Sequence, residues 1–345
     1  MKRIIVAEIL YPIGHKTYDR KMIELLAHEN SLTVLNYKGF LDEFVNDNIE
    51  YVELPKQIII KKHEPFIQSG IYYNLRVIKR IIKNKKYDAI IFLSCNNSML
   101  KIIGNMFKGT KVFVIHHNDI DALKTEKQLK KFKRGMNYVE HITLADFITE
   151  GLAQKTGCPI TRIHTIPHPL ISRIFGYDDL QERDKTLVGL GLSNDEAFID
   201  SCIEIDKSLP NPLNYTIVLR SKIKEYKGKS LKIIKGYLDD ETYNRYYYSA
   251  SAIIICYPKQ FQNRYSSTLI NAIAQNGRVI FNEFPMGEAE SKKYPHIMSV
   301  VKRPNDLFTI NESFFCSPID QRERELFLEE HSDDKVIESL HNTLE

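Results

Sequence analysis

Short apolar runs alternate with amphipathic segments along almost the whole chain. In the first half, apolar runs that favour strands occupy residues 3–10, 31–37, 50–55, 87–94 and 111–118. Between them, apolar residues recur every three or four positions, which predicts helices near 18–28, 69–84 and 98–107. The strand segments are continuous in Ile and Val, so both faces of their sheet should be covered, as in a parallel sheet. This alternation predicts right-handed βαβ units and a doubly wound α/β fold.

The same alternation begins again after residues 168–185, a segment without a clear period. Strands are predicted at 186–192, 214–220, 230–238, 250–258 and 278–283, and a capped helix is predicted at 194–209. We therefore expect two Rossmann-like doubly wound domains that face each other across a cleft. The expected limits are 1–169 for the N-terminal domain, 170–185 for the linker, 186–318 for the C-terminal domain and 319–345 for terminal helices that cross back.

Composition adds a charge asymmetry to this picture of a globular protein. No apolar run approaches the roughly 20 residues that span a bilayer. The five cysteines are odd in number and widely spaced, which argues against disulfides and a zinc site and favours a reducing cytoplasm. Residues 1–169 carry 26 basic against 17 acidic side chains, whereas residues 170–345 carry 22 against 27. The basic half suits an anionic surface, unless its charges are only solvated faces.

Ligands of open parallel sheets bind outside the carboxyl ends of the strands. The loops at those ends are 11–17, 94–98, 116–121, 192–196, 220–229, 236–241 and 258–268. The last is the most informative, because it opens directly into a short apolar helix whose N-terminus suits a phosphate. Ser266, Ser267 and Thr268 add hydroxyl donors there, and Arg264 adds a guanidinium. The alternative is that a serine only caps this helix and Arg264 is solvated.

Two neighbouring loops of the second half supply further candidates. Main-chain groups of Gly236, Tyr237 and Leu238 could hydrogen-bond a base edge, with Tyr237 or Leu238 against its face. Lys222 follows the strand at 214–220 and could assist a phosphate. The tyrosine-rich helix at 243–248 fits packing better than binding.

The first half offers less specific candidates. His116 and His117 end a strand and should point to opposite faces, and a structural role is the alternative for each. Gly14, His15 and Lys16 follow the first strand without G-x-G-x-x-G spacing. No P-loop, H-E-x-x-H or G-x-S-x-G motif is present, and the residues at 119–121 make a poor metal motif. No metal or other cofactor is expected.

From about residue 110 onwards, the chain resembles the GT-B glycosyltransferases, most closely the retaining, family-4-like enzymes of glycosyl transferases group 1. The resemblance rests on the order of VFVIHHN (112–118), IHTIPHPL (163–170), KGYLDDETYNRYYYSASAIIICYP (235–258) and NRYSSTLINAIAQNGRVI (263–280). The two glutamates of the family's E-x7-E motif are replaced here by Asn263 and Asn271. An amide can still bind hydroxyl groups, but it brings no negative charge to the reacting centre.

The resemblance implies roles for the candidates. His117 and Asn263 would be the catalytic residues beside the transferred sugar, and Asn271 would bind the ribose. Gly236, Tyr237 and Leu238 would hold the base, and residues 266–268 the diphosphate. The family's Arg and Lys near the first strand of this domain are absent, so Arg220, Lys222 and Arg264 are expected to neutralise the phosphates. Gly14, His15 and Lys16 are the acceptor-binding candidates.

The implied activity is that of a metal-independent glycosyltransferase, of hexosyltransferase type. It would move a sugar from a nucleotide-sugar donor to a glycan or lipid-linked saccharide acceptor in surface polysaccharide (capsule, O-antigen) synthesis. The basic stretches at 70–86 and 127–135 predict peripheral contact with anionic lipid at the inner face of the plasma membrane, and no nucleic-acid partner is expected. The alternatives are a non-catalytic nucleotide-sugar-binding homologue and a GT-B nucleotide-sugar epimerase.

Overall fold

The computed structural model describes residues 1–10, 15–41, 48–55, 67–176 and 183–345. The chain divides into two compact units. The first unit comprises Met1–Pro169, Asn263–Tyr265 and His331–Glu345, and the second comprises Leu170–Gln262 and Ser266–Glu330. The short segment Asn263–Tyr265 thus belongs to the first unit, although the residues on both sides of it belong to the second.

A parallel sheet forms the centre of the first unit. Among the described residues its strands are β1 (Arg3–Glu8), β2 (Ser31–Asn36), β3 (Ile49–Glu53), β4 (Ala89–Ser94), β5 (Lys111–Ile115), β6 (Glu140–Thr143) and β7 (Ile163–Thr165). They lie in the order β3-β2-β1-β4-β5-β6-β7, and every neighbouring pair is parallel. The strand order reverses between β1 and β4, where Glu8 pairs with Ser94.

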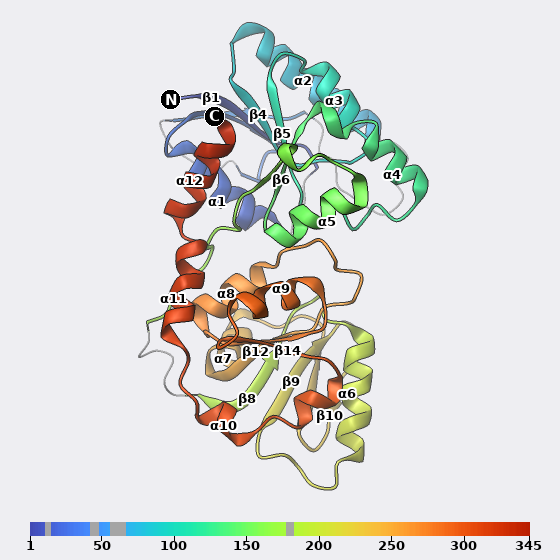
Figure 1. Cartoon of the computed structure of the whole chain (residues 1–345), viewed down its shortest axis with the longest axis vertical. Coiled ribbons are helices and arrows are strands. Elements are labelled where there is room, and N and C mark those ends of the chain that lie inside the picture. Colours follow the sequence, from blue (N-terminus) through green and yellow to red (C-terminus); the bar gives the residue numbers. More distant parts are fainter. Residues whose placement is uncertain (11–14, 42–47, 56–66, 177–182) are drawn as a thin grey trace. The chain divides into compact units, whose positions relative to one another are not determined.

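Amphipathic helices cover this sheet. They are α1 (Lys16–Ala27), α2 (Ile67–Asn84), α3 (Leu100–Met106), α4 (Glu126–Lys133), α5 (Asp146–Thr156) and α12 (Asp333–Leu344). Figure 1 shows the C-terminal helix α12 beside α1 and both termini close together. A salt bridge of 2.8 Å between Lys21 and Asp333 joins these two helices at their surface. Beneath it, Met22 and Ile23 of α1 and Val336 of α12 are completely buried, so the core of the first unit includes the end of the chain.

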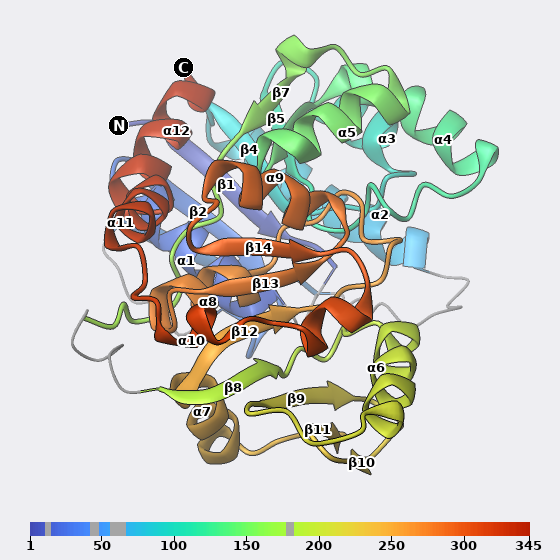
Figure 2. The same cartoon turned by 60° about the horizontal axis from the view of Figure 1, so that its bottom comes forward.

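The second unit repeats the architecture. Its described strands are β8 (Asp184–Gly189), β9 (Thr216–Ser221), β10 (Tyr226–Lys227), β11 (Leu231–Lys235), β12 (Ala250–Ile255), β13 (Val279–Asn282) and β14 (Met298–Val301). The order is β10-β11-β9-β8-β12-β13-β14, with only β10 antiparallel to its neighbour among these strands. Figure 2 shows β12, β13 and β14 side by side and running in the same direction. The strand order reverses between β8 and β12.

The helices of the second unit follow the predicted strand–helix alternation. They are α6 (Glu196–Ser208), α7 (Asp240–Ser249), α8 (Ser267–Gln275), α9 (Pro285–Lys293), α10 (Glu312–Cys316) and α11 (Gln321–Glu330). Side-chain caps start several of them, for example Asp195 at α6 and Asp239 at α7. No helix in the described part of the chain is both long and apolar enough to cross a bilayer.

The predicted fold class is confirmed, because both units are doubly wound α/β sheets. The predicted strands are present, and most of them end earlier than their apolar runs; the run at 111–118, for instance, pairs only over Lys111–Ile115. Strands β6, β10 and β14 and helices α4, α5, α9 and α10 were not predicted; the three strands have only two to four residues each, which gives little periodicity to recognise. All five cysteines are free thiols, and none is in a disulfide.

Candidate functional site

Buried polar atoms without hydrogen-bond partners gather at one edge of each sheet. Ten such atoms in the described residues follow the carboxyl ends of strands or lie where α1 begins. In the first unit they are His15 Nδ1, Tyr18 Oη, both Asp19 carboxylate oxygens, Asn36 Nδ2, Asn97 Oδ1 and Asp119 Oδ1, and in the second they are Asn194 Oδ1, Arg220 Nη2 and Asn282 Oδ1. Buried polar groups are nearly always paired, so such a concentration marks a place where polar ligands supply the missing bonds. It coincides with the edge at which doubly wound sheets bind ligands.

Arg220, near the carboxyl end of β9, is the central side chain of the second unit's edge. It is 5% exposed. Its Nε donates to the Gly236 carbonyl at 2.5 Å and its Nη1 to the Leu190 carbonyl at 3.3 Å, while Nη2 has no partner. Burial lowers the pKa of this guanidinium, and the groups that oppose the shift are the hydroxyls of Tyr237 and Tyr243 rather than any carboxylate. A buried cation without an acidic partner is suited to an anionic ligand.

Polar groups of three further elements surround Arg220. Asn194, in the loop after β8, donates to the Gly189 carbonyl at 2.8 Å and to the Arg220 carbonyl at 3.0 Å, which leaves its own Oδ1 unpaired. Tyr243 of α7 interacts electrostatically with Tyr257 and Arg220, and burial raises the pKa of Tyr243 to about 12. The Tyr257 hydroxyl lies 2.8 Å from Ser266 Oγ. The edge therefore extends from Arg220 to the start of α8.

The hydroxyl-rich start of α8 is held by capping interactions. Ser266 is the N-cap, and its Oγ accepts from the Thr268 N–H at 3.2 Å. The Tyr257 hydroxyl also donates to Thr268 Oγ1 at 3.3 Å. Ser267 is the first residue of the helix. Capping by a serine is therefore observed, whereas Arg264 is paired with Asp121 rather than solvated. Phosphate binding by residues 266–268 stays a prediction.

The remaining candidates of the second unit lie near this edge or pair elsewhere. Lys222 is exposed, and its backbone N–H donates to Glu196 Oε1 at 3.0 Å. Tyr237 is 86% exposed and Leu238 is half-buried before the cap of α7. Asn271 accepts a hydrogen bond from the Ser172 hydroxyl. Whether Asn271 binds a ribose stays a prediction.

Asn263 and Arg264 are bound by Asp121 of the first unit, a partnership that the sequence did not indicate. The Asp121 carboxylate accepts from the Asn263 N–H at 3.0 Å, from Asn263 Nδ2 at 3.1 Å and from Arg264 Nε at 2.7 Å. A Cβ at Gly151 would lie 1.9 Å from Asn263 Oδ1, so only glycine leaves room for this amide. The roles predicted for Asn263 at the sugar and for Arg264 at the phosphate remain predictions, but both side chains already have a partner here.

Tyr265 completes the attachment of this segment. Its ring packs against Phe147 and His168, and its hydroxyl lies 3.1 Å from His331 Nε2. His331 Nδ1 lies 2.7 Å from the His168 carbonyl, which can only accept, so His331 Nε2 must accept from Tyr265.

His117, the predicted residue beside the sugar, is a neutral imidazole. It is half-buried, with Nε2 at 3.1 Å from the Leu93 carbonyl, so Nε2 carries the proton and Nδ1 carries a lone pair. Its ring contacts His15 at 4.1 Å and Tyr18 at 4.7 Å between centroids. Burial, followed by the neighbouring His15 and His168, holds the pKa of His117 well below its usual value. A hydroxyl group is a suitable partner for the Nδ1 lone pair.

His116, which follows the last residue of β5, belongs to a buried chain of hydrogen bonds that does not include His117. His141 Nε2 donates to the Met136 carbonyl at 3.0 Å, so His141 Nδ1 accepts from His116 Nε2 at 2.8 Å. Burial lowers the pKa of His141 to about 3. His116 Nδ1 then lies 2.7 Å from Asp119 Oδ2, with one proton between the two atoms. This chain holds the turn after β5 and leaves Asp119 Oδ1 unpaired.

Two completely buried carboxyl groups lie near the switch point of the first unit. Glu8 Oε1 accepts from the Leu10 N–H at 2.7 Å and from the Ser94 hydroxyl at 2.5 Å. Asp19 has no hydrogen bond to either oxygen. Burial, and then the neighbouring Glu8, raise the pKa of Asp19 well above its usual range.

The structure describes two of the three acceptor-binding candidates, His15 and Lys16. Gly14 lies outside the described residues. His15 is the N-cap of α1, and its pKa is lowered by burial against the opposing charge of Asp119. Lys16 is the first residue of that helix and is half-buried. Acceptor binding by these residues stays a prediction.

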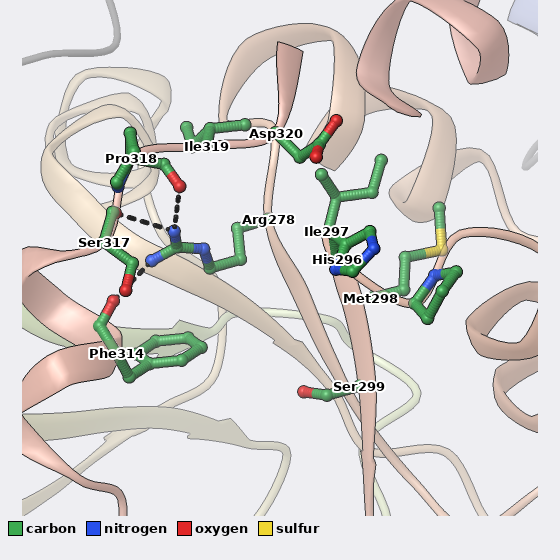
Figure 3. Close-up of a pocket in the computed structure, with 11 residues that line it drawn as sticks. Arg278, His296, Ile297, Met298, Ser299, Phe314, Ser317, Pro318, Ile319 and Asp320 are labelled. Carbon is green, nitrogen blue, oxygen red and sulfur yellow. Dashed lines mark hydrogen bonds between the residues drawn. The ribbon is translucent and has the colours of Figure 1, made fainter. Parts of the chain in front are cut away.

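A separate hollow of about 440 Å³ lies at the opposite, amino end of β13 and β14. Figure 3 shows Arg278 in its wall, with the guanidinium donating to the carbonyls of Phe314, Ser317 and Pro318 at 2.7 to 3.0 Å. The same guanidinium lies 4.6 Å from the centre of the Phe314 ring. These contacts attach the segment between α10 and α11 to the sheet, so a structural role accounts for the guanidinium of Arg278.

No model of a known protein family matches the sequence, and no curated protein sequence matches it. Solved structures do match over the whole chain. The lipopolysaccharide outer core galactosyltransferase WaaB matches with a TM-score of 0.67 and 10% identity, over 100% of this chain and 99% of that one. HepE of Anabaena in complex with UDP matches with a TM-score of 0.68 and 10% identity, over 100% of this chain and 99% of that one. Sucrose-phosphate synthase of Thermosynechococcus elongatus matches with a TM-score of 0.68 and 11% identity, over 99% of this chain and 98% of that one.

The chain has the GT-B fold. Both doubly wound units contribute to the match, because the alignments leave out almost none of either chain. At about 10% identity, this likeness shows the fold alone. The GT-B fold confirms the architecture that was expected from the alternation of strands and helices.

Four residues at or near the carboxyl edges of the two sheets were not among the sequence candidates, namely Asn194, Tyr257, Asp121 and Asp19. The first two lie in or beside loops that the carboxyl-end rule had selected, so that rule carried a usable signal for them. Asp121 lies in such a loop too, but its partners are 142 and 143 residues away. No local pattern reveals a contact of that separation.

Proposed function

We propose that this protein is a glycosyltransferase that moves a sugar from a nucleotide-sugar donor to a glycan or lipid-linked saccharide acceptor in surface polysaccharide synthesis. The whole-chain likeness to the galactosyltransferase WaaB and to HepE with bound UDP supports this class of reaction. HepE has also been solved with UDP-glucose.

The observation that carries the proposal is Arg220. It places a buried guanidinium with an unpaired Nη2 at the carboxyl edge of the second unit, without a carboxylate partner in the described residues. A diphosphate supplies both the charge and the acceptor atoms that this group lacks. Tyr237 lies directly against Arg220 and supplies an aromatic ring at the same strand end.

The leaving nucleoside diphosphate must be stabilised as the glycosidic bond breaks. In the proposed reaction Arg220 and the start of α8 provide that stabilisation, and no metal takes part. His117 contributes a neutral Nδ1 that accepts a hydrogen bond from a substrate hydroxyl. Its depressed pKa makes it a poor proton acceptor at neutral pH, so its role is orientation.

Donor binding is tested by thermal shift of the whole chain against UDP-, GDP-, ADP- and CMP-sugars, once with EDTA and once with added Mg²⁺. One of these donors should raise the midpoint by about 5 °C at saturating concentration, because a ligand that binds only the folded state stabilises it. The absence of a shift with all four would contradict the proposal. A shift that requires added Mg²⁺ would contradict the metal-independent part alone.

A second candidate function is nucleotide-sugar binding without transfer. The observation in its favour concerns Asn263, which stands at the position of the family's first glutamate. This side chain is already hydrogen-bonded to Asp121. The two functions differ in turnover. A glycosyltransferase supplied with its donor and a mixture of saccharide acceptors releases nucleoside diphosphate, whereas a binding protein leaves the donor intact.

We also propose that the first unit docks on anionic lipid through α2 and α4. On α2 the side chains of Arg76, Lys79, Arg80, Lys83 and the following Lys86 are exposed, whereas Lys85 is paired with Glu50 at 2.7 Å. Tyr72 and Tyr73 on the same helix are 44% and 50% exposed. Basic and aromatic side chains together favour the lipid interface.

Charge reversal of α2 should abolish this binding. The combined variant Lys79→Glu, Arg80→Glu, Lys83→Glu should lower affinity for phosphatidylserine-containing vesicles roughly 100-fold, since each basic residue contributes about 1 kcal/mol. Vesicle flotation at low salt measures it. The matched control reverses three exposed lysines of the second unit, Lys227, Lys259 and Lys302. Equal loss in both variants, or no flotation of the wild type, would refute the docking surface.

A further inference from the structure

The ring of Tyr237 covers the guanidinium of Arg220. The centre of the ring lies 5.1 Å from Arg220 Cζ, a cation–π contact. Tyr237 is nevertheless 86% exposed, and Arg220 is only 5% exposed. No other ring contact or hydrogen bond of the Tyr237 side chain is found in the described part of the chain, so the contact with Arg220 alone holds the ring in place.

The backbone around the ring allows it to move while Arg220 stays fixed. Gly236 has φ +78°, a left-handed conformation that glycine adopts without strain. Its carbonyl accepts from Arg220 Nε, and its N–H donates to the Ser221 carbonyl at 2.9 Å. The guanidinium is therefore fixed through Nε and Nη1, whereas the tyrosine side chain beyond Gly236 is free to change rotamer.

A phosphate competes successfully with the ring for Arg220. An exposed cation–π contact is weak, whereas a hydrogen bond between a guanidinium and a phosphate is charge-assisted and at least as strong. Arg220 Nη2 has hydrogen-bonding capacity that the ring does not use. The ring, once displaced, exposes a flat apolar face at the same strand end.

We propose that Tyr237 is a two-position ring, which covers Arg220 in the free protein and turns away to stack on the nucleotide base when a diphosphate binds the guanidinium. This deepens the proposed function and rests on it for the identity of the ligand. Binding of the diphosphate and stacking of the base then support each other. The diphosphate displaces the ring from Arg220, and the displaced ring stacks on the base. Pyrophosphate alone must still displace the ring, but it gains nothing from stacking.

Removal of the ring should therefore change the two affinities in opposite directions. Tyr237→Ala should weaken UDP binding roughly tenfold through the lost stacking. The same variant should bind inorganic pyrophosphate about two- to fivefold more tightly, because no ring has to leave Arg220. A residue with a purely structural role would weaken both ligands together. Calorimetric titration of the whole chain with each probe measures the two constants.

The movement itself can be observed by fluorescence, because the chain contains no tryptophan. In the variant Tyr237→Trp the single indole should change its emission when pyrophosphate is added and change further with UDP. In the double variant with Arg220→Met, pyrophosphate should cause no change. UDP binding that leaves both the emission and the Tyr237→Ala affinity unaltered would overturn the proposal. A pyrophosphate response without binding of any nucleotide sugar would support the two-position ring and contradict the proposed function instead.

Discussion

Asn263→Glu should destabilise the folded protein by about 3 kcal/mol at neutral pH, the scale on which uncompensated buried charges act. The substitution removes the Nδ2 donor and places a second carboxylate beside Asp121, which is itself 6% exposed. Part of the loss should be recovered in mild acid, because a proton shared by two adjacent carboxyl groups relieves their repulsion. Urea unfolding of the variant at neutral and at mildly acidic pH measures the effect.

The second asparagine of the pair is the matched control. Asn271 accepts from the Ser172 hydroxyl, and a hydroxyl donates equally well to a carboxylate. Asn271→Glu should therefore cost far less stability than Asn263→Glu. The double variant Asp121→Asn, Asn263→Glu should regain part of the loss, because the new amide donates to the new carboxylate. Equal stability of the two single glutamate variants would contradict the proposed importance of the contact with Asp121.

Arg220→Met should lower the affinity for the nucleotide donor roughly 10- to 100-fold, as expected when a hydrogen bond to a charged group is lost. The substitution also leaves the carbonyls of Gly236 and Leu190 without their donor, so the midpoint of unfolding is measured alongside affinity. Arg245→Met is the control, because Arg245 is an exposed arginine on α7. Unchanged affinity in a folded Arg220→Met protein would remove Arg220 from the donor site.

The Asn263→Glu prediction concerns a position at which the resemblance to the family-4-like enzymes implies a glutamate. A glutamate at position 263 would repel Asp121, whereas an asparagine donates to it twice, through its backbone and its side chain. The physical explanation for Asn263 thus lies in the partner that the fold supplies. The sequence comparison had presented the same asparagine only as a missing charge.

Much of the fold could be predicted from the sequence, because the relevant signals are local. Continuous Ile and Val runs predicted strands buried on both faces, and in the structure Ile253, Ile254 and Ile255 of β12 are each 1% exposed. Three short strands were missed, namely β6, β14 and the two-residue β10, because so few residues give little periodicity.

What the sequence determined by itself is the doubly wound α/β class and the set of loops at the carboxyl ends of the strands. Both depend on hydrophobic periodicity, which spans a few residues and survives in any tertiary context. Only the tertiary structure decided which polar side chains in those loops have partners. Arg264 pairs with Asp121, whereas Arg220 has an unpaired Nη2, and no local pattern distinguishes the two arginines. The reason is that a hydrogen bond depends on atoms that may be more than a hundred residues apart in the chain, as Asp121 and Asn263 are.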